Sequence, residues 1–226
     1  MANETSSADP SESAGASGHP RLKLYQFAAS GNSRIVRLVL EEKGLPFERI
    51  NIDVTKGENR TPEFLKLNPR GKVPVLIHST PEGDLLLSES SVINEYLEEV
   101  FPHPPLMPVA PAKRAHVREM VYLFDTQLSP TTGLLIIEKL LKKPEEQRAD
   151  FVAERLAATR DILARLVEMM SDGPFLAGDF SLADASYIPV LSVMAPCGII
   201  LDREFPKLAK WFAEVKKRPS FTASAH

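Results

Sequence analysis

Two short segments of the sequence carry residue types suited to recognising a small charged peptide. Pro74 interrupts an alternating apolar run that begins at Val73. Proline has no N–H for a sheet ladder, so this position requires a sheet edge, a bulge or a cis peptide bond, and each leaves the backbone of Val73 free to face outward. Glu89 and Ser90 open a helix shortly afterwards, and they would supply a carboxylate, a hydroxyl and a helix N-terminus. The sequence therefore predicts a peptide-binding surface.

The other reactive residue types indicate neither a metal site nor redox chemistry. The single cysteine, Cys197, lies in an apolar stretch, so we predict a buried and inert thiol. One cysteine also excludes an intrachain disulfide and a C-x-x-C pair. The five histidines show no pair at the spacing of metal ligands, and we therefore expect no metal.

Composition narrows the class of protein further. The chain has 226 residues, of which 43% are hydrophobic and 25% charged, with a formal net charge of −3. Interspersed charges of both signs do not form the basic stripe that nucleic acid requires, so no nucleic-acid partner is expected. No apolar run approaches the ~18 residues of a membrane span, and the start does not resemble a signal segment. We expect a cytoplasmic protein with no membrane partner.

The elements that would position these residues follow an α/β pattern over residues 21–101. Apolar alternation predicts strands and apolar helical periodicity predicts helices, in the order β, α, β, α, β, β, α. Gly44 would stop the first helix, and Thr61 with Pro62 would begin the second. The expected elements are a strand over 22–27, a helix over 33–43, a strand through Ile50, Ile52 and Val54, a helix from Pro62 to Asn68, a hairpin of 73–78 with 85–87, and a helix over 90–100.

The rest of the chain divides into three further parts. Residues 1–20 are rich in small, polar and acidic residues and read as a disordered tail. Residues 102–108 form a proline-rich linker, and residues 109–226 read as an all-helical domain. Ser181 and Asp184 fit the start of one of its helices. The expected helices cover 112–128, 131–142, 144–170, 182–194 and 205–217.

Five short motifs follow one another along the segment 21–221. They are Ser30-Gly31-Asn32-Ser33-Arg34, Leu67-Asn68-Pro69-Arg70-Gly71-Lys72-Val73-Pro74-Val75-Leu76, Leu87-Ser88-Glu89-Ser90, Phe180-Ser181-Leu182-Ala183-Asp184 and Arg218-Pro219-Ser220. Each motif alone is weak, but in their order and spacing they resemble a cytosolic glutathione S-transferase of the serine type. The resemblance implies a thioredoxin-like domain with a mixed sheet, followed by an all-α helical bundle.

The resemblance also implies a role for each matching residue. Ser30 stands where serine-type members carry the hydroxyl that hydrogen-bonds to the glutathione sulfur, and Asn32 resembles an asparagine near the same sulfur. Val73-Pro74 resembles a cis-proline step whose backbone pairs with the cysteinyl part of glutathione. Glu89 and Ser90 resemble the pair that holds the γ-glutamyl end, and Lys72 a residue that approaches the glycine end.

The function implied is activation of glutathione, a co-substrate, as a thiolate and its conjugation to a small hydrophobic electrophile. The resemblance further implies a homodimer. Asp125 is a candidate for reaching the glutathione amine, with a solvated or capping carboxylate as the alternative. An acceptor pocket between the two domains needs apolar walls, for which the candidates are Phe27, Ala28, Tyr122, Thr131 and Leu134.

Several alternatives stay open at this point. Ser30 also suits ordinary turn chemistry, and Glu89-Ser90 also suits simple first-turn capping. Tyr25 is a rival hydroxyl, but it falls inside the strand and is predicted to pack in the core. The same site would also suit a glutathione-dependent disulfide or peroxide reductase, a dehalogenase or an etherase. A different class again is a non-catalytic glutathione-binding or ligand-binding scaffold.

Overall fold

The computed structural model describes residues 21–225. They divide into two compact units, and the boundary along the chain falls between Pro104 and Pro105. This division falls inside the segment 102–108 that the sequence marks as a linker. The predicted tail, residues 1–20, lies outside the described residues. Among residues 21–225, no helix is both long and apolar enough to cross a membrane.

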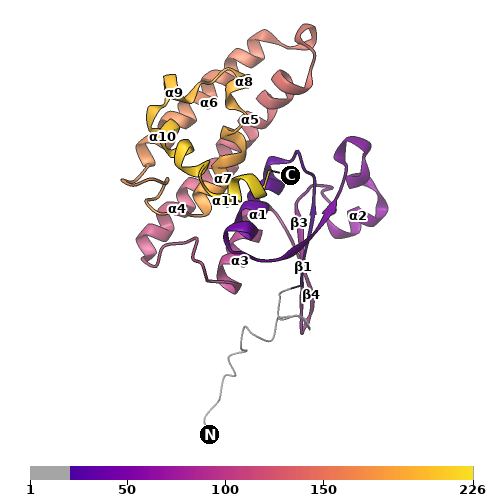
Figure 1. Cartoon of the computed structure of the whole chain (residues 1–226). Coiled ribbons are helices and arrows are strands. Elements are labelled where there is room, and N and C mark those ends of the chain that lie inside the picture. The colour runs from indigo at the N-terminus through magenta and orange to yellow at the C-terminus, as the bar shows by residue number, and fades with distance from the viewer. Residues whose placement is uncertain (1–20, 226) are drawn as a thin grey trace. The chain divides into compact units, whose positions relative to one another are not determined.

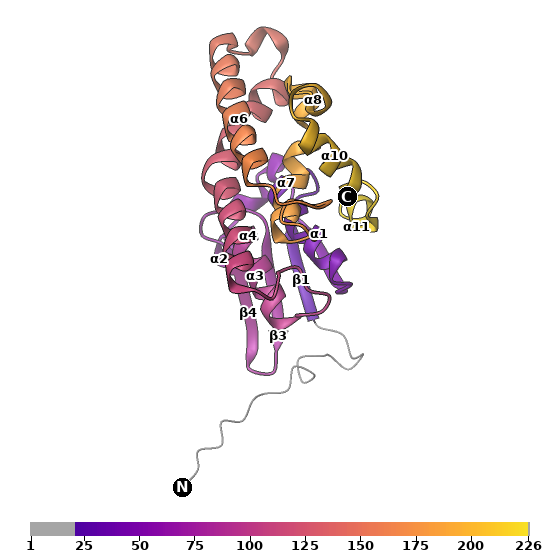
Figure 2. The same cartoon turned by 90° about the vertical axis from the view of Figure 1, so that its left-hand side faces the viewer.

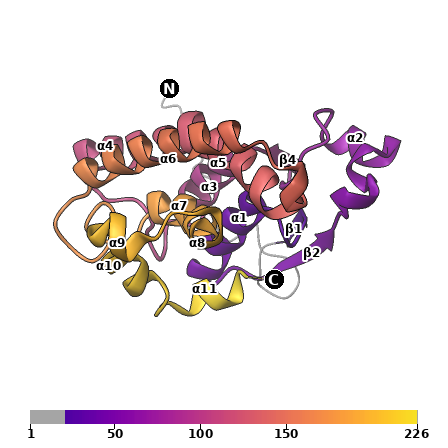
Figure 3. The same ribbon diagram turned by 90° about the horizontal axis from the view of Figure 1, so that it is seen from above.

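The N-terminal unit is built on a four-stranded mixed sheet with the strand order β2-β1-β3-β4. Strand β1 runs parallel to β2 and antiparallel to β3, and β3 is antiparallel to β4. Helices α1 and α3 cover one face of the sheet, and α2 lies on the other (Figures 1 and 3). This is the thioredoxin-like arrangement. Its elements are β1 (Arg21–Gln26), α1 (Gly31–Glu42), β2 (Phe47–Asn51), α2 (Pro62–Leu67), β3 (Val75–Thr80), β4 (Gly83–Ser88) and α3 (Ser90–Val100).

Local sequence signals explain where the helices of this unit begin and end. The side chain of Thr61 accepts a hydrogen bond from the N–H of Phe64, and Pro62 takes the first helical position of α2. Gly44 follows the end of α1 with a φ of +62°, a left-handed conformation that glycine adopts without steric cost. The predicted stop of α1 at Gly44 and the predicted start of α2 are confirmed, whereas the predicted start of α1 is wrong, because the helix begins at Gly31, two residues earlier.

Three boundaries in the sheet differ from the prediction. Strand β2 ends at Asn51 rather than continuing to Val54, because the carboxylate of Asp53 accepts the N–H of Thr55 and folds the chain into a short 3₁₀ turn. The hairpin turn is shorter than predicted, since β3 extends to Thr80 and β4 starts at Gly83. Strand β3 begins only at Val75, so the prediction that Val73 and Pro74 lie within the strand is wrong.

The C-terminal unit contains only helices, and its buried side chains are mostly apolar. Helix α5 packs against α6, and α4 packs against α7; Figure 2 shows α4 and α6 as its long helices. The elements are α4 (Pro111–Leu123), α5 (Ser129–Ile136), α6 (Ala149–Met169), α7 (Leu182–Leu191), α8 (Met194–Cys197), α9 (Leu201–Glu204), α10 (Pro206–Val215) and α11 (Pro219–Ala223). The short α9 and α11 were not predicted.

The prediction of two separate helices over 112–128 and 131–142 is wrong, because the chain stays helical from Pro111 to Leu141. Pro130 lacks the N–H that a regular helix needs and would clash with the preceding turn. A π-helical segment, Phe124–Leu128, comes just before it, and the N–H of Ser129 reaches back five residues to the carbonyl of Phe124. The wider turn accommodates the proline without a break.

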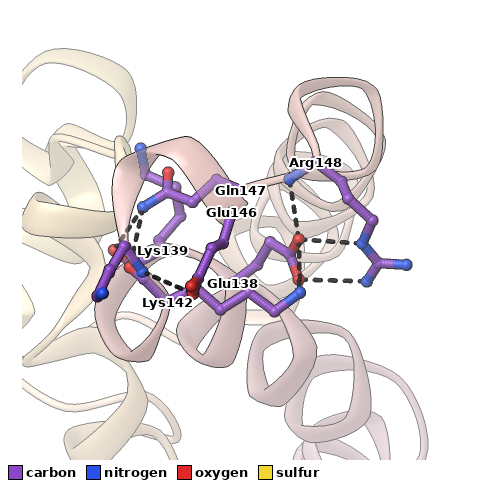
Figure 4. A network of polar contacts seen from close by, with 7 residues as sticks. Glu138, Lys139, Lys142, Glu146, Gln147 and Arg148 are labelled. Carbon is purple, nitrogen blue, oxygen red and sulfur yellow. Dashed lines mark hydrogen bonds and ion pairs between the residues drawn. The ribbon is translucent and has the colours of Figure 1, made fainter.

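A second π-helical segment, Ile137–Leu141, contains the buried carboxylate of Glu138 (Figure 4). Its oxygens accept the backbone N–H of Arg148 at 2.9 Å, the Nε at 3.0 Å and the Nη2 at 3.2 Å, and they also pair with Lys142. These bonds lower the pKa of Glu138 to about 2. They also hold Arg148 in an extended conformation, which explains why α6 begins at Ala149 rather than at the predicted Pro144.

Another buried carboxylate, Asp184, joins three segments of this unit. It accepts hydrogen bonds from the N–H of Leu176, from the N–H and hydroxyl of Ser181, and from Nε1 of Trp211 at 2.7 Å. The predicted helix start at Ser181 and Asp184 is confirmed. The bond to Trp211 also explains why this buried side chain lies next to the start of α7. Cys197 is buried as predicted, and burial raises the pKa of its thiol.

Candidate functional site

Strand register brings three of the predicted segments to the same end of the sheet in the N-terminal unit. Tyr25, near the end of β1, lies opposite Val75, and Val75 in turn lies opposite Ser88 at the end of β4. Ser30 follows β1, Val73-Pro74 precede β3, and Glu89-Ser90 follow β4. The segments predicted to bind one ligand therefore share one edge of the unit (Figure 1).

Ser30 occupies the N-cap position of α1. Its Oγ accepts the N–H of Ser33 at 3.3 Å, and its own N–H donates to the carbonyl of Phe27 at 2.9 Å. A hydroxyl has one proton and two lone pairs, so the capping bond uses a lone pair and leaves the O–H proton free to donate. The residue is half-buried and lies at the positive end of the helix dipole. This geometry suits the stabilisation of an anion beside Ser30. Tyr25, the rival hydroxyl, is half-buried within β1.

Asn32 lies in the first turn of α1, two residues after Ser30, with its side chain exposed. Its position is open to a ligand at the same helix end. A role for Asn32 as a second donor to the sulfur stays a prediction.

The backbone of Val73 is poised to pair with an extended ligand. The Val73–Pro74 peptide bond is cis, Pro74 is buried and Val73 is half-exposed. Among the described residues, neither the N–H nor the C=O of Val73 has a hydrogen-bond partner. A strand-like segment of a ligand would satisfy both groups in the manner of β-augmentation.

The loop before Val73 is fixed by side chains bonded to its backbone. Asn68 Nδ2 donates to the carbonyl of Lys72 at 2.8 Å, and Asn59 Nδ2 donates to the carbonyl of Gly71 at 2.7 Å. Gly71 has a φ of +62°, and a Cβ there would lie 2.9 Å from the carbonyl oxygen of Asn59, so only glycine fits. The loop leaves the side chain of Lys72 exposed beside Val73, where a ligand carboxylate would be accessible to it.

Glu89 adopts an unusual conformation for its residue type, with a φ of +74°. Non-glycine residues rarely adopt positive φ, and such positions cluster at functional sites. Among the described residues, the Glu89 side chain makes no capping bond to α3; its carboxylate pairs instead with Arg70. Simple first-turn capping therefore does not account for Glu89. Ser90, the first residue of α3, is buried beside it.

Two residues with contacts in this site were missed by sequence reasoning. Arg70 pairs with Glu89 across 19 residues of sequence. Arg37 is fully buried in α1, and it donates to the side chain of Gln26 and to the carbonyl of Ala28. The only local signal was an arginine within the apolar run from Ile35 to Leu40, and such a residue is ordinarily expected to face solvent.

The residues predicted to line the acceptor pocket belong to both units. Phe27 and Ala28 lie in the loop after β1, whereas Tyr122, Thr131 and Leu134 lie on the helical run from Pro111 to Leu141, as does Asp125. Tyr122 and Leu134 are exposed. A pocket shared by these residues stays a prediction.

Two further observations concern other ligands. The C-terminal unit has an open cavity of about 770 Å³ lined by Met107, Lys113 and Phe180 among others, and it contains none of the predicted acceptor residues. Within residues 21–225, no group of three or more histidine, cysteine, aspartate or glutamate side chains is placed to hold a metal ion.

Comparison with known proteins covers both units. Residues 29–100 match the family model described as "Glutathione S-transferase, N-terminal domain". Residues 132–219 match the model described as "Glutathione S-transferase, C-terminal domain".

Three similar proteins illustrate the range of relatives. Glutathione S-transferase 1 of Dianthus caryophyllus is 34% identical over 83% of this chain and 84% of its own length. FtsZ-localized protein A of Caulobacter vibrioides is 34% identical over 88% of each chain. A glutathione transferase of Phanerochaete chrysosporium, solved with oxidized glutathione, has a TM-score of 0.81 and 26% identity, covering 91% of this chain and 93% of that one.

Proposed function

Because the chain belongs to the glutathione S-transferase family, we propose that it binds glutathione on its N-terminal unit and conjugates the thiolate to a small hydrophobic electrophile. The observation that carries this proposal is the geometry of Ser30, whose oxygen caps α1 while its O–H proton stays free. The proposal includes the serine-type assignment and a cytoplasmic homodimer.

The proposed complex gives each residue a separate task. The backbone of Val73 pairs with the cysteinyl part of glutathione, which places the sulfur near Ser30. The carboxylate of Glu89 and the hydroxyl of Ser90 receive the γ-glutamyl end, and the ammonium of Lys72 receives the glycine carboxylate. Asn32 is the second candidate donor to the sulfur. Support comes from the free backbone of Val73 and from the shared edge to which the strand register brings these segments.

Thiolate stabilisation is the chemical task of the site. A free thiol is mostly protonated at neutral pH, whereas the thiolate is the nucleophile. A hydrogen bond to a charged group contributes about 1.5–3 kcal/mol, which corresponds to a fall of about one to two units in the thiol pKa at 1.36 kcal/mol per unit. The released proton goes to solvent. The sulfur then forms a bond to the electrophilic carbon. In substitution the leaving group departs with its bonding electron pair, and in addition to a double bond the π electron pair moves to the neighbouring atom, which takes a proton from solvent.

A second candidate function is a non-catalytic scaffold that keeps the fold. The observation in its favour is the similarity to FtsZ-localized protein A, whose name refers to localisation rather than to a reaction. The scaffold alternative gives no chemical reason for the free Val73 backbone and the available Ser30 proton to occur together. Reductase, dehalogenase and etherase reactions on the same site are further variants, which the choice of electrophile distinguishes.

The deciding experiment is a difference ultraviolet titration of bound glutathione against pH, because thiolate absorbs where thiol does not. We expect the wild-type protein to lower the thiol pKa below that of free glutathione. Ser30→Ala should retain binding and raise that pKa by about one to two units. Ser30→Thr keeps both the capping oxygen and the proton, so it should behave as wild type.

The matched control is Ser79→Ala, the same substitution in β3 away from the site, and it should leave the thiol pKa unchanged. Binding of glutathione with an unshifted thiol pKa in the wild-type protein would contradict the proposed activation and favour the scaffold.

A further inference from the structure

Arg37 is buried directly behind the loop that carries Ser30. Its side chain is fully buried in α1, Nη1 donates to the side chain of Gln26, and Nη2 donates to the carbonyl of Ala28 at 3.1 Å. Burying a guanidinium carries a large desolvation penalty, which its hydrogen bonds only partly offset. An apolar side chain would fill the same space in α1 without that penalty. The contacts of Arg37 therefore point to a role beyond packing.

The hydrogen bonds of Arg37 span the loop from its strand side to its helix side. Gln26 is the last residue of β1, and Ala28 precedes Ser30 by two positions. A second bond from α1 reinforces the tie, because the Oγ of buried Ser33 accepts the N–H of Phe27 at 3.3 Å. The backbone from Phe27 to Ser30 is thus bonded to α1 through Ser33, Arg37 and the cap itself.

We propose that Arg37 is the positioning residue of this site, which holds the Phe27–Ser30 loop so that Ser30 caps α1 through its oxygen and directs its O–H toward the glutathione sulfur. The inference deepens the proposed function and rests on it for the role of Ser30. Arg37 acts through the Ala28 carbonyl and does not itself touch the ligand.

The charge of Arg37 works in the same direction. Burial, together with the nearby positive charges of Arg49 and Arg34, lowers its pKa to about 10. The guanidinium therefore remains protonated at neutral pH. A charged donor makes a stronger hydrogen bond than a neutral one, so the bond to the Ala28 carbonyl restrains the loop more firmly than an amide side chain would.

The test combines substitutions at positions 37 and 30 with the thiol titration. Arg37→Met removes both donors and keeps a side chain of similar length, and Arg37→Lys keeps the charge without the planar fork. The control is Arg49→Met, which removes another arginine of the same unit, one paired with Glu41. We expect Arg37→Met to keep the glutathione dissociation constant within about threefold and to raise the bound-thiol pKa by about one pH unit, a tenfold fall in the ionisation constant of the thiol. Arg37→Lys should be intermediate, and Arg49→Met should match wild type.

A double-mutant cycle shows whether Arg37 acts through Ser30. In the Ser30→Ala background, Arg37→Met should add no further shift of the thiol pKa. An equal shift in both backgrounds would mean that Arg37 acts on the sulfur directly, and this would overturn the positioning role. An unchanged thiol pKa together with a lower melting temperature would also overturn it, since that pattern indicates packing alone. If Arg37→Met does not fold, Arg37→Lys takes its place in the same cycle.

A measurement without ligand separates this inference from the proposed function. Amide hydrogen exchange reports local opening of the backbone. The N–H of Ser30 and of Ser33, which are bonded to Phe27 and to Ser30 respectively, should exchange faster in Arg37→Met than in Arg49→Met or wild type. Equal exchange in all three proteins would refute the positioning of the loop, even if wild type fails to activate glutathione.

Discussion

Apart from the buried Ser90, the polar side chains of the proposed site in the N-terminal unit lie at or near the surface, whereas two carboxylates of the C-terminal unit, Asp184 and Glu138, are buried. Ser30 is half-exposed, and Lys72 and Glu89 are exposed. Asp184 accepts hydrogen bonds from Leu176 and from Trp211, 27 residues away, and Glu138 accepts them from Lys142 and from Arg148, ten residues away. Polar groups that stay accessible can exchange water for a ligand, and groups that are already bonded inside the protein instead fix the geometry of the chain.

The N-terminal unit also contains buried polar contacts. His78 in β3 is buried in the N-terminal unit, and its Nδ1 lies 2.7 Å from the hydroxyl of Tyr96 on α3. The buried ion pair of Lys43, the residue that follows α1, with Glu98 of α3 joins the ends of these two helices in the same unit. The N-terminal unit therefore also uses buried polar contacts to hold its own elements together, as Arg37 does behind the Ser30 loop, whereas Ser30, Lys72 and Glu89 stay accessible to a ligand.

The largest effect should come from Asp184→Ala. This change leaves the N–H groups of Leu176 and Ser181 and the Nε1 of Trp211 without their acceptor inside the protein. Since each unsatisfied buried donor costs about 1–3 kcal/mol, we expect a loss of about 3–5 kcal/mol in the free energy of unfolding, measured by denaturant titration. Asp179→Ala removes an exposed carboxylate nearby and should change little. An equal loss of unfolding free energy in Asp184→Ala and Asp179→Ala would show that the buried carboxylate does not contribute more to stability than the exposed one.

Glu138→Gln should lower the free energy of unfolding by less than Asp184→Ala does. It should also change how stability depends on pH under acidic conditions. Hydrogen bonds from Arg148 lower the pKa of the Glu138 carboxyl from 4.5 to about 2. Between these two values the unfolded chain binds a proton at this carboxyl and the folded chain does not. The contribution of Glu138 to the free energy of unfolding is therefore fully present above pH 4.5 and is lost as the pH falls toward 2. Melting temperatures measured across this range should depend less on pH in the variant. Glu145→Gln, at an exposed position on the same connection, should retain the wild-type slope.

His78→Gln tests how the buried histidine of the N-terminal unit affects stability. Burial lowers the pKa of His78 below its ordinary value of 6.5. As pH falls below 6.5, the unfolded state binds a proton before the folded state does, so wild-type stability decreases with acid. The variant lacks this titration and should show a flatter melting temperature between pH 7 and about pH 5. An unchanged slope would exclude His78 as the source.

The smallest stability effect should come from Arg70→Ala. Arg70 and Glu89 form an exposed pair, and such pairs contribute about 0–1 kcal/mol. The melting temperature should move very little, and the small difference should shrink further in about 1 M salt. A loss as large as that of Asp184→Ala would show that the site edge is part of the structural framework, and the contrast between the two units would then fail.

Much of the fold is predictable because its signals are local. Thr61 with Pro62, Gly44, and Ser181 with Asp184 each mark a helix boundary through bonds that span only a few residues. Predictions failed where a distant or unusual partner decides the conformation. Because proline usually ends a helix, the sequence predicted a break between two helices near Pro130. In the structure a π-helical turn just before Pro130 accommodates the proline, and the helix continues.

The candidate site was less accessible to sequence reasoning than the fold. Residue types alone suggested a peptide-binding edge at Val73 and Glu89, whereas the individual roles came from family resemblance. The contact of Arg37 with Ala28 spans nine residues, and that of Arg70 with Glu89 spans 19. Such contacts depend on how the sheet and helices pack, and neither arginine belongs to a local motif that predicts its partner.

The unpartnered backbone of Val73 determines which substitutions the proposed site would accept at this position. An N–H and a C=O are common to nearly every residue type, so in the proposed complex the ligand is recognised through the path of the chain and not through the valine side chain. Position 73 is therefore open to replacement by isoleucine or threonine. The constraint on sequence falls instead on the nearby Gly71, where a side chain would not fit.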